Sequence, residues 1–279
     1  MQLSDSNVVE RPLLEHIDEL RSRVVRILLS IVIISAFIFI FSFREFNIGD
    51  VTMSLPYPDV YNNMATGILE RIQELVLPSY VDVVLTTPGQ ALMAQLYVAI
   101  MIGIIASMPV IIREVNAFVS PGLHPSERKI IRNVSGPAIL LFLVGSFFAL
   151  YFVAPYTMNF LYRYGLALNA LTFITVDELI GFVVFFVIAF GLSFQLPIAM
   201  WVLTRVGIVE PRIWRDNWRY VFVALVVFGA IITPDGSGIT MWFIAIPMMI
   251  LYVIGYVSTR SMGTEGMNRQ TVGDESQQS

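Results

Sequence analysis

Long uninterrupted runs of apolar residues are the feature that most constrains what this chain can fold into. Six of them occur, at Ile27–Phe43, Ala91–Ile112, Val134–Val153, Ile180–Leu203, Tyr220–Ile232 and Ile239–Val257. All but the fifth have the roughly 17–25 residues that a helix needs to cross a bilayer. Because lipid offers the backbone no hydrogen-bond partners, spans of this kind must be helical. The sequence therefore predicts an all-α integral membrane protein with six transmembrane helices.

The composition supports this class and excludes several others. The chain of 279 residues is 56% hydrophobic and only 14% charged, whereas soluble domains have about 25% charged residues. Its formal net charge of −4 gives no reason to expect a nucleic-acid partner. The absence of cysteine excludes disulfides, thiol catalysis and thiolate metal sites.

The basic residues predict which ends of the spans are cytoplasmic. Fourteen of the seventeen Arg and Lys residues lie in the N-terminal segment, in 113–133, in 204–219 and in the C-terminal tail. By the positive-inside rule both termini face the cytoplasm. We expect a cytoplasmic amphipathic segment over 1–26, a six-helix bundle over 27–257, and a polar, disordered tail over 258–279.

The remaining segments are predicted to cap the bundle on its outer side. The first is the loop 44–90, in which apolar residues recur at helical spacing from Met64 to Val76, so an amphipathic helix is expected there. The second is 154–178, which is rich in interfacial tyrosines. No internal repeat is visible, so the inverted-repeat pattern of many secondary transporters is missing.

The fifth span is unusually short. Its thirteen residues, Tyr220 to Ile232, would form a helix of about 20 Å, against a hydrocarbon core of about 30 Å. Two explanations remain open from the sequence. The helix is sheltered among longer neighbours, or the bilayer thins locally around it as part of the mechanism.

Two carboxylates near the predicted cytoplasmic face are candidate binding groups. Glu19 in "PLLEHIDELRSRVVR" lies four residues before Arg23, in the favourable orientation for an ion pair. Glu127 in "SPGLHPSERKIIR" would be the third residue of a helix beginning at Pro125, where its charge complements the helix dipole. Alternatively, both carboxylates face one groove and bind a cation, and only arginine offers the planar fork that a carboxylate accepts bidentately.

Two residues in the fourth span are also unusual for a membrane helix. Gln195 is an amide among apolar residues, so it needs a partner helix or a wet cavity. Pro197 should kink the helix.

Catalytic sets are missing from the sequence, because the two histidines, His16 and His124, lie far apart and no phosphate-binding glycine loop occurs. We therefore expect neither an enzyme nor a cofactor.

Taken together, the motifs resemble one family, TatC, the polytopic core of the twin-arginine protein translocase. The resemblance rests on five stretches in the expected order: "HIDELRSRV", "PVIIREVNAFVSPGLHPSERK", "FFALYFVAPYTMNFL", "AFGLSFQLP" and "RYVFVALVVFGAIITPDGSG" followed by "AIP". It implies a receptor in a prokaryotic plasma membrane for folded precursors with paired-arginine signal peptides. The chain departs from many members at Gln195 and Val253, where a glutamate is common.

The resemblance also implies roles for particular residues and partners. Signal-peptide contacts are expected at Glu19, Arg21, Phe118 and Glu127. Single-span subunits of the TatA and TatB kind are expected to pack near Gln195, Pro197 and Thr233, with the proton-motive force as energy source and further copies of the chain in the complex. The alternative functions are a small-solute or ion secondary transporter, which would need charged residues at the membrane midplane, and an intramembrane enzyme.

Overall fold

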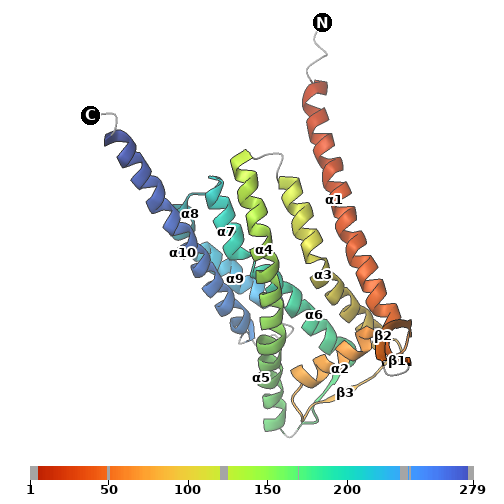
Figure 1. Ribbon diagram of the computed structural model, residues 1–279. Coiled ribbons are helices and arrows are strands. Elements are labelled where there is room, and N and C mark those ends of the chain that lie inside the picture. The colour runs from red at the N-terminus through yellow and green to blue at the C-terminus, as the bar shows by residue number, and fades with distance from the viewer. Residues whose placement is uncertain are drawn as a thin grey trace. The chain divides into compact units, whose positions relative to one another are not determined.

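Helices make up most of the computed structural model (Figure 1). It describes residues 6–48, 51–119, 125–168, 170–232, 238 and 240–275, with side chains for 17–44, 54–119, 129–168, 170–231, 238 and 240–260. The helices are α1 (Ser6–Ile40), α2 (Met64–Val76), α3 (Gln90–Val119), α4 (Pro125–Phe148), α5 (Ala154–Ala167), α6 (Val176–Ser193), α7 (Leu196–Arg205), α8 (Pro211–Asp216), α9 (Trp218–Ile232) and α10 (Thr240–Glu275), with a π-helix at Ala149–Val153. The strands are β1 (Phe41–Ile48), β2 (Val51–Pro58), β3 (Asp82–Val84) and β4 (Phe173–Thr175).

The predicted membrane class is confirmed. Within the described residues, five helical stretches are long and apolar enough to cross a membrane: Ile17–Ile40, Gln90–Val119, Lys129–Ala167, Val176–Arg205 and Thr240–Arg260. A sixth apolar helix, α9, has only 15 residues, so the predicted shortness of the fifth span is also confirmed. Many apolar side chains of α1 are exposed, among them Leu28, Val32 and Ile33, as expected for a surface that contacts lipid.

The loop 44–90, which the sequence predicts to lie on the outer side, contains more than the amphipathic helix expected there. Helix α2 confirms that expectation. Ahead of it, β1 and β2 form an antiparallel hairpin that pairs Phe41 with Pro58 and Ile48 with Val51. The alternation Phe41-Ser42-Phe43-Arg44 has the period of a strand, and it ends α1 at Ile40 rather than at the predicted Phe43. The all-α expectation therefore needs correction in this loop.

A short parallel pairing joins the two predicted outer caps. Strand β3, from the first cap, pairs with β4, from the second, with Val83 opposite Ile174. Helix α5 occupies most of the second cap and continues α4 through the π-helix, so the third helical stretch is longer than predicted. The C-terminal helix α10 likewise runs to Glu275, through most of the 258–279 tail for which the sequence predicted disorder.

At Pro197, where the sequence predicts a kink, the structure has a break between two helices. Helix α6 ends at Ser193 and α7 begins at Leu196, with Phe194 and Gln195 in a turn between them. The cause is the proline, whose ring lacks an amide hydrogen and excludes the carbonyl one turn earlier. Beyond the break, α7 lies close to α10, because a Cβ placed on Gly255 would be only 3.1 Å from the Pro197 Cα.

The chain divides into two compact units, one of residues 1–71 and 85–139 and the other of 72–84 and 140–279. In the first, α1 packs along α3, and a Cβ on Gly103 would lie 3.0 Å from the Ile31 carbonyl oxygen. The second unit has the larger core. Its fully buried side chains include Phe142, Phe186, Phe190, Ile244 and Met248.

Gly145 marks a very close helix approach in the second unit and gives a stability prediction. A Cβ there would lie 2.8 Å from the Phe190 carbonyl oxygen, which cannot move without bending α6. We expect Gly145→Ala to lower the free energy of unfolding in detergent by about 1–3 kcal/mol, as for other overpacked cores. Gly181→Ala is the matched control, since nothing lies within 4 Å of the position that its new Cβ would take. Equal stability of the two variants would contradict this packing.

Candidate functional site

A buried carboxylate near the C-terminal end of α3 joins this helix to the middle of α1. Glu114 on α3 is 2% exposed and lies among three guanidinium groups. Its Oε2 atom accepts from Nη1 of Arg23 at 3.3 Å and lies 3.0 Å from Nη1 of Arg26. Its Oε1 atom is 3.4 Å from Nη2 of Arg113. Because an isolated buried charge is very costly, a carboxylate buried at this position needs cationic partners, and these three arginines supply them.

Glu19 belongs to the same network through Arg23. The Nε and Nη2 atoms of Arg23 both donate to Oε1 of Glu19, at 3.1 and 2.5 Å. The ion pair predicted from the spacing of four residues is therefore present. Arg23 also reaches Glu114, so one guanidinium bridges two carboxylates. Glu19, Arg23, Arg26, Arg113 and Glu114 are together called the Glu114 cluster below.

The sequence builds this cluster by helical periodicity. Glu19, Arg23 and Arg26 are spaced four and three residues apart, which places them on one face of α1. That face packs on α3, where Glu114 follows the apolar run that ends at Ile112. Glu114 was missed by the sequence analysis. The available signal was that a carboxylate directly after a membrane span needs a partner, and two arginines on α1 could supply it.

The structure describes the side chains of two of the other predicted signal-peptide residues, Arg21 and Phe118. Arg21 is exposed on α1, and Phe118 is half-buried near the end of α3. Helix α4 begins at Pro125, so Glu127 is its third residue, as the spacing predicted. The Glu127 side chain lies outside the described residues. Of the carboxylates predicted at this site, Glu19 is therefore the one whose contacts the structure describes.

The residues predicted to contact partner helices lie at and beyond the break in the fourth span. Gln195 is half-buried in the turn between α6 and α7, and its carbonyl oxygen accepts the first backbone hydrogen bond of α7, from the amide of Ala199 at 2.8 Å. Pro197 is buried. Thr233 lies outside the described residues. Across the part of the chain with described side chains, no group of three His, Asp or Glu residues could hold a metal ion.

Comparison with known proteins identifies the family. The model of the family described as Sec-independent protein translocase protein (TatC) matches residues 15–247. The chain belongs to the TatC family. A TatC protein of Cenarchaeum symbiosum is 42% identical over 241 residues, which cover 86% of this chain and 91% of the relative. The TatC of Aquifex aeolicus is 32% identical over 256 residues, which cover 89% and 96%.

A solved structure agrees with this assignment. A crystal structure described as the twin-arginine translocase receptor TatC superposes with a TM-score of 0.72 at 29% identity, covering 88% of this chain and 98% of that one. As a TatC protein, the chain is a multi-pass membrane component of the Sec-independent protein translocase and not an enzyme. The predicted family and transport role are confirmed, and the solute-transporter and enzyme alternatives are set aside.

Proposed function

We propose that this TatC protein is the receptor that binds paired-arginine signal peptides of folded precursors at its cytoplasmic face. The observation that carries the proposal is the arginine already bound to Glu19. Both Nε and Nη2 of Arg23 donate to this carboxylate, and its side chain is still 34% exposed. A site that holds one guanidinium while remaining open to solvent has the chemistry needed to bind another.

The same geometry allows an arginine of the signal peptide to replace Arg23 at Glu19. When an arginine of the peptide approaches Glu19, Arg23 must give up part of its contact there. Arg23 keeps a partner as it does so, since its Nη1 atom lies 3.3 Å from Glu114. The buried Glu114 thus lowers the cost of freeing Glu19. We assign Glu127 as the second carboxylate of the receptor, and Phe118 and Arg21 as residues that shape its surroundings, on the family resemblance.

The proposed orientation has six spans with both termini in the cytoplasm of a prokaryotic cell. Its support is the distribution of basic residues, of which only Arg44, Arg71 and Arg163 lie on the outer side in this arrangement. Archaeal and bacterial relatives carry the same family name. In this orientation α9, with 15 residues, is the span that crosses least of the bilayer.

We further propose that single-span subunits of the TatA and TatB kind pack near the break between α6 and α7, in a complex that contains several copies of this chain. Gln195 supports this position, because it is a half-buried polar residue at the break in a membrane span, and amide side chains form hydrogen bonds between membrane helices. We assign Pro197 and Thr233 to the same region on the family resemblance. The proton-motive force drives export in this proposal, since the sequence has no nucleotide-binding loop.

A peptide-binding experiment tests the receptor proposal. A fluorescent twin-arginine signal peptide and its twin-lysine version are titrated onto the full-length protein in nanodiscs. We expect the arginine peptide to bind at least tenfold more tightly, because a carboxylate accepts the guanidinium fork in two parallel hydrogen bonds and the ammonium group cannot reproduce them. Equal affinities, or no binding of either peptide, would remove the receptor proposal and leave Glu19 as a structural partner of Arg23.

A further inference from the structure

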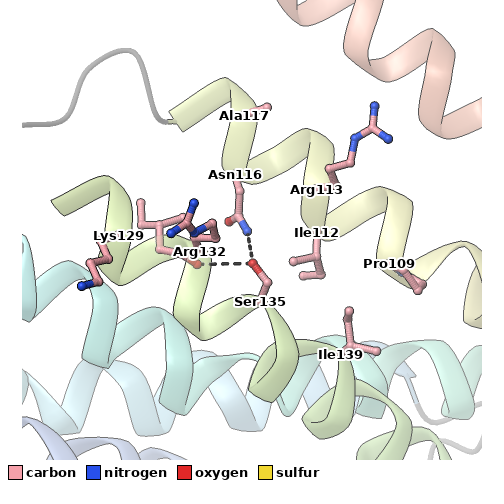
Figure 2. Close-up of a pocket in the computed structure, with 10 residues that line it drawn as sticks. Pro109, Ile112, Arg113, Asn116, Ala117, Lys129, Arg132, Ser135 and Ile139 are labelled. Atoms are coloured by element: carbon pink, nitrogen blue, oxygen red, sulfur yellow. Dashed lines mark hydrogen bonds between the residues drawn. The ribbon is translucent and has the colours of Figure 1, made fainter. Parts of the chain in front are cut away.

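A pocket of about 590 Å³ lies between α3 and α4 in the first unit (Figure 2). Asn116 on α3 donates through Nδ2 to the Ser135 hydroxyl on α4 at 2.7 Å, and Ser135 donates in turn to the Ile131 carbonyl at 3.4 Å. The first of these bonds ties α3 to α4 beside the pocket, and the second lies within α4. The polar side chains of Asn116 and Ser135 line the pocket together with charged and apolar side chains.

The charged residues of the lining are all cations. They are Arg113 from α3 and Lys129 and Arg132 from α4, and no carboxylate is among the lining residues whose side chains the structure describes. All three cations are exposed. Arg113 has a carboxylate neighbour in Glu114, whereas Lys129 and Arg132 have no ion pair with any residue whose side chain is described. These described cations therefore favour the binding of an anion in the pocket.

The polarity of the pocket changes along the helices in a defined direction. Figure 2 shows Lys129 and Arg132 toward one end and Pro109 and Ile139 toward the other. The basic end coincides with the start of the apolar stretch Lys129–Ala167, so Ile139 lies about 15 Å deeper into the span at 1.5 Å per residue. A phospholipid has the same order of groups, with its phosphate at the membrane surface and its acyl chains below.

We propose that this pocket binds one anionic phospholipid. Its phosphate lies beside Lys129 and Arg132, and an acyl chain lies against Ile112 and Ile139. A soluble phosphate compound would satisfy the cations but leave the apolar wall uncovered. An anionic lipid matches both parts. The inference requires α3 and α4 to be membrane spans, and it does not depend on recognition of a signal peptide.

Native mass spectrometry of the full-length protein tests the site. The protein is released from micelles that contain phosphatidylglycerol and phosphatidylcholine in equal amounts, and the bound lipids are counted. We expect Lys129→Gln/Arg132→Gln to reduce the preference for phosphatidylglycerol at least tenfold, since each cation near an anionic lipid contributes about fivefold. Arg212→Gln/Arg215→Gln is the matched control, because it removes two exposed arginines of α8 outside the pocket. We expect it to change the preference less than twofold.

Two outcomes of these measurements would contradict the proposal. Equal losses in the two double variants mean that lipid selection follows overall charge, and the pocket is not the site. Displacement of the lipid by millimolar glycerol 1-phosphate means that the pocket binds phosphate without requiring the acyl chain. If the double variant does not fold, Lys129→Gln and Arg132→Gln are measured singly, each with an expected loss of about fivefold. No peptide is present, so the result is independent of the receptor test.

Discussion

Glu114→Ala is expected to be the most destabilising substitution in the first unit. The change removes a carboxylate that is 2% exposed and leaves Arg23, itself only 15% exposed, without its contact on α3. Removing one partner of a buried ion pair usually lowers the free energy of unfolding by several kcal/mol, and we expect a loss of about 3 kcal/mol here. The free energy of unfolding is measured by denaturant titration in detergent.

Two further variants determine whether the loss comes from the buried charge. Glu114→Gln keeps the side-chain volume and a hydrogen-bond acceptor, so its loss should be smaller than that of Glu114→Ala. Asp216→Ala removes the carboxylate of a 3.1 Å pair with Arg215 in which both side chains are exposed, at 66% for Arg215 and 62% for Asp216. Exposed pairs contribute at most about 1 kcal/mol. If Glu114→Ala costs no more than Asp216→Ala, Glu114 does not hold α1 on α3.

Glu19→Gln is expected to cause the largest loss of recognition. A hydrogen bond to a charged group contributes about 1.5–3 kcal/mol, which corresponds to roughly 10- to 150-fold in affinity. Titration with the two fluorescent peptides should show that the variant binds the twin-arginine peptide at least tenfold more weakly and no longer prefers it to the twin-lysine peptide. Asp18→Asn is the matched control, because it removes an adjacent, exposed carboxylate outside the Glu114 cluster.

Arg23→Gln separates the exchange of arginines from a purely structural role of Glu19. The substitution removes the guanidinium that donates to Oε1 of Glu19, while Glu114 keeps Arg26 at 3.0 Å. The twin-arginine peptide should therefore bind more tightly to Arg23→Gln than to the unmodified protein. A weaker affinity would mean that Arg23 helps to shape the receptor site, and the proposed exchange would have to be abandoned.

The sequence was most informative where a residue's environment is fixed by the bilayer. Apolar runs must be helical in lipid, and so the spans and the short α9 were predictable. Spacing along one helix was also sufficient to predict the Glu19–Arg23 pair and the start of α4 at Pro125. The break before α7 followed from Pro197 alone, because a proline acts on the turn that precedes it.

Contacts between elements that are distant in the chain were not predictable in this way. The hairpin of β1 and β2 depends on the pairing of Phe41–Ile48 with Val51–Pro58, which the strand-like alternation at the start of β1 does not specify by itself. Glu114 acquires its role from Arg23, which is 91 residues away. No local sequence pattern connects Glu114 with Arg23, so the pair could not be predicted from spacing along one helix.

By itself, the sequence determined that this chain is a helical membrane protein of the TatC type with carboxylates near one membrane face. The TatC type follows from the resemblance of its motifs, whereas the helical membrane class follows from local interactions, in which each helix responds to lipid or to residues within a turn of itself. Only the tertiary structure decided that α1 lies on α3, that Arg23 bridges two carboxylates, and that a basic pocket opens between α3 and α4. The physical reason is that charges and cavities at helix contacts depend on which faces meet, and that is set by packing over the whole unit.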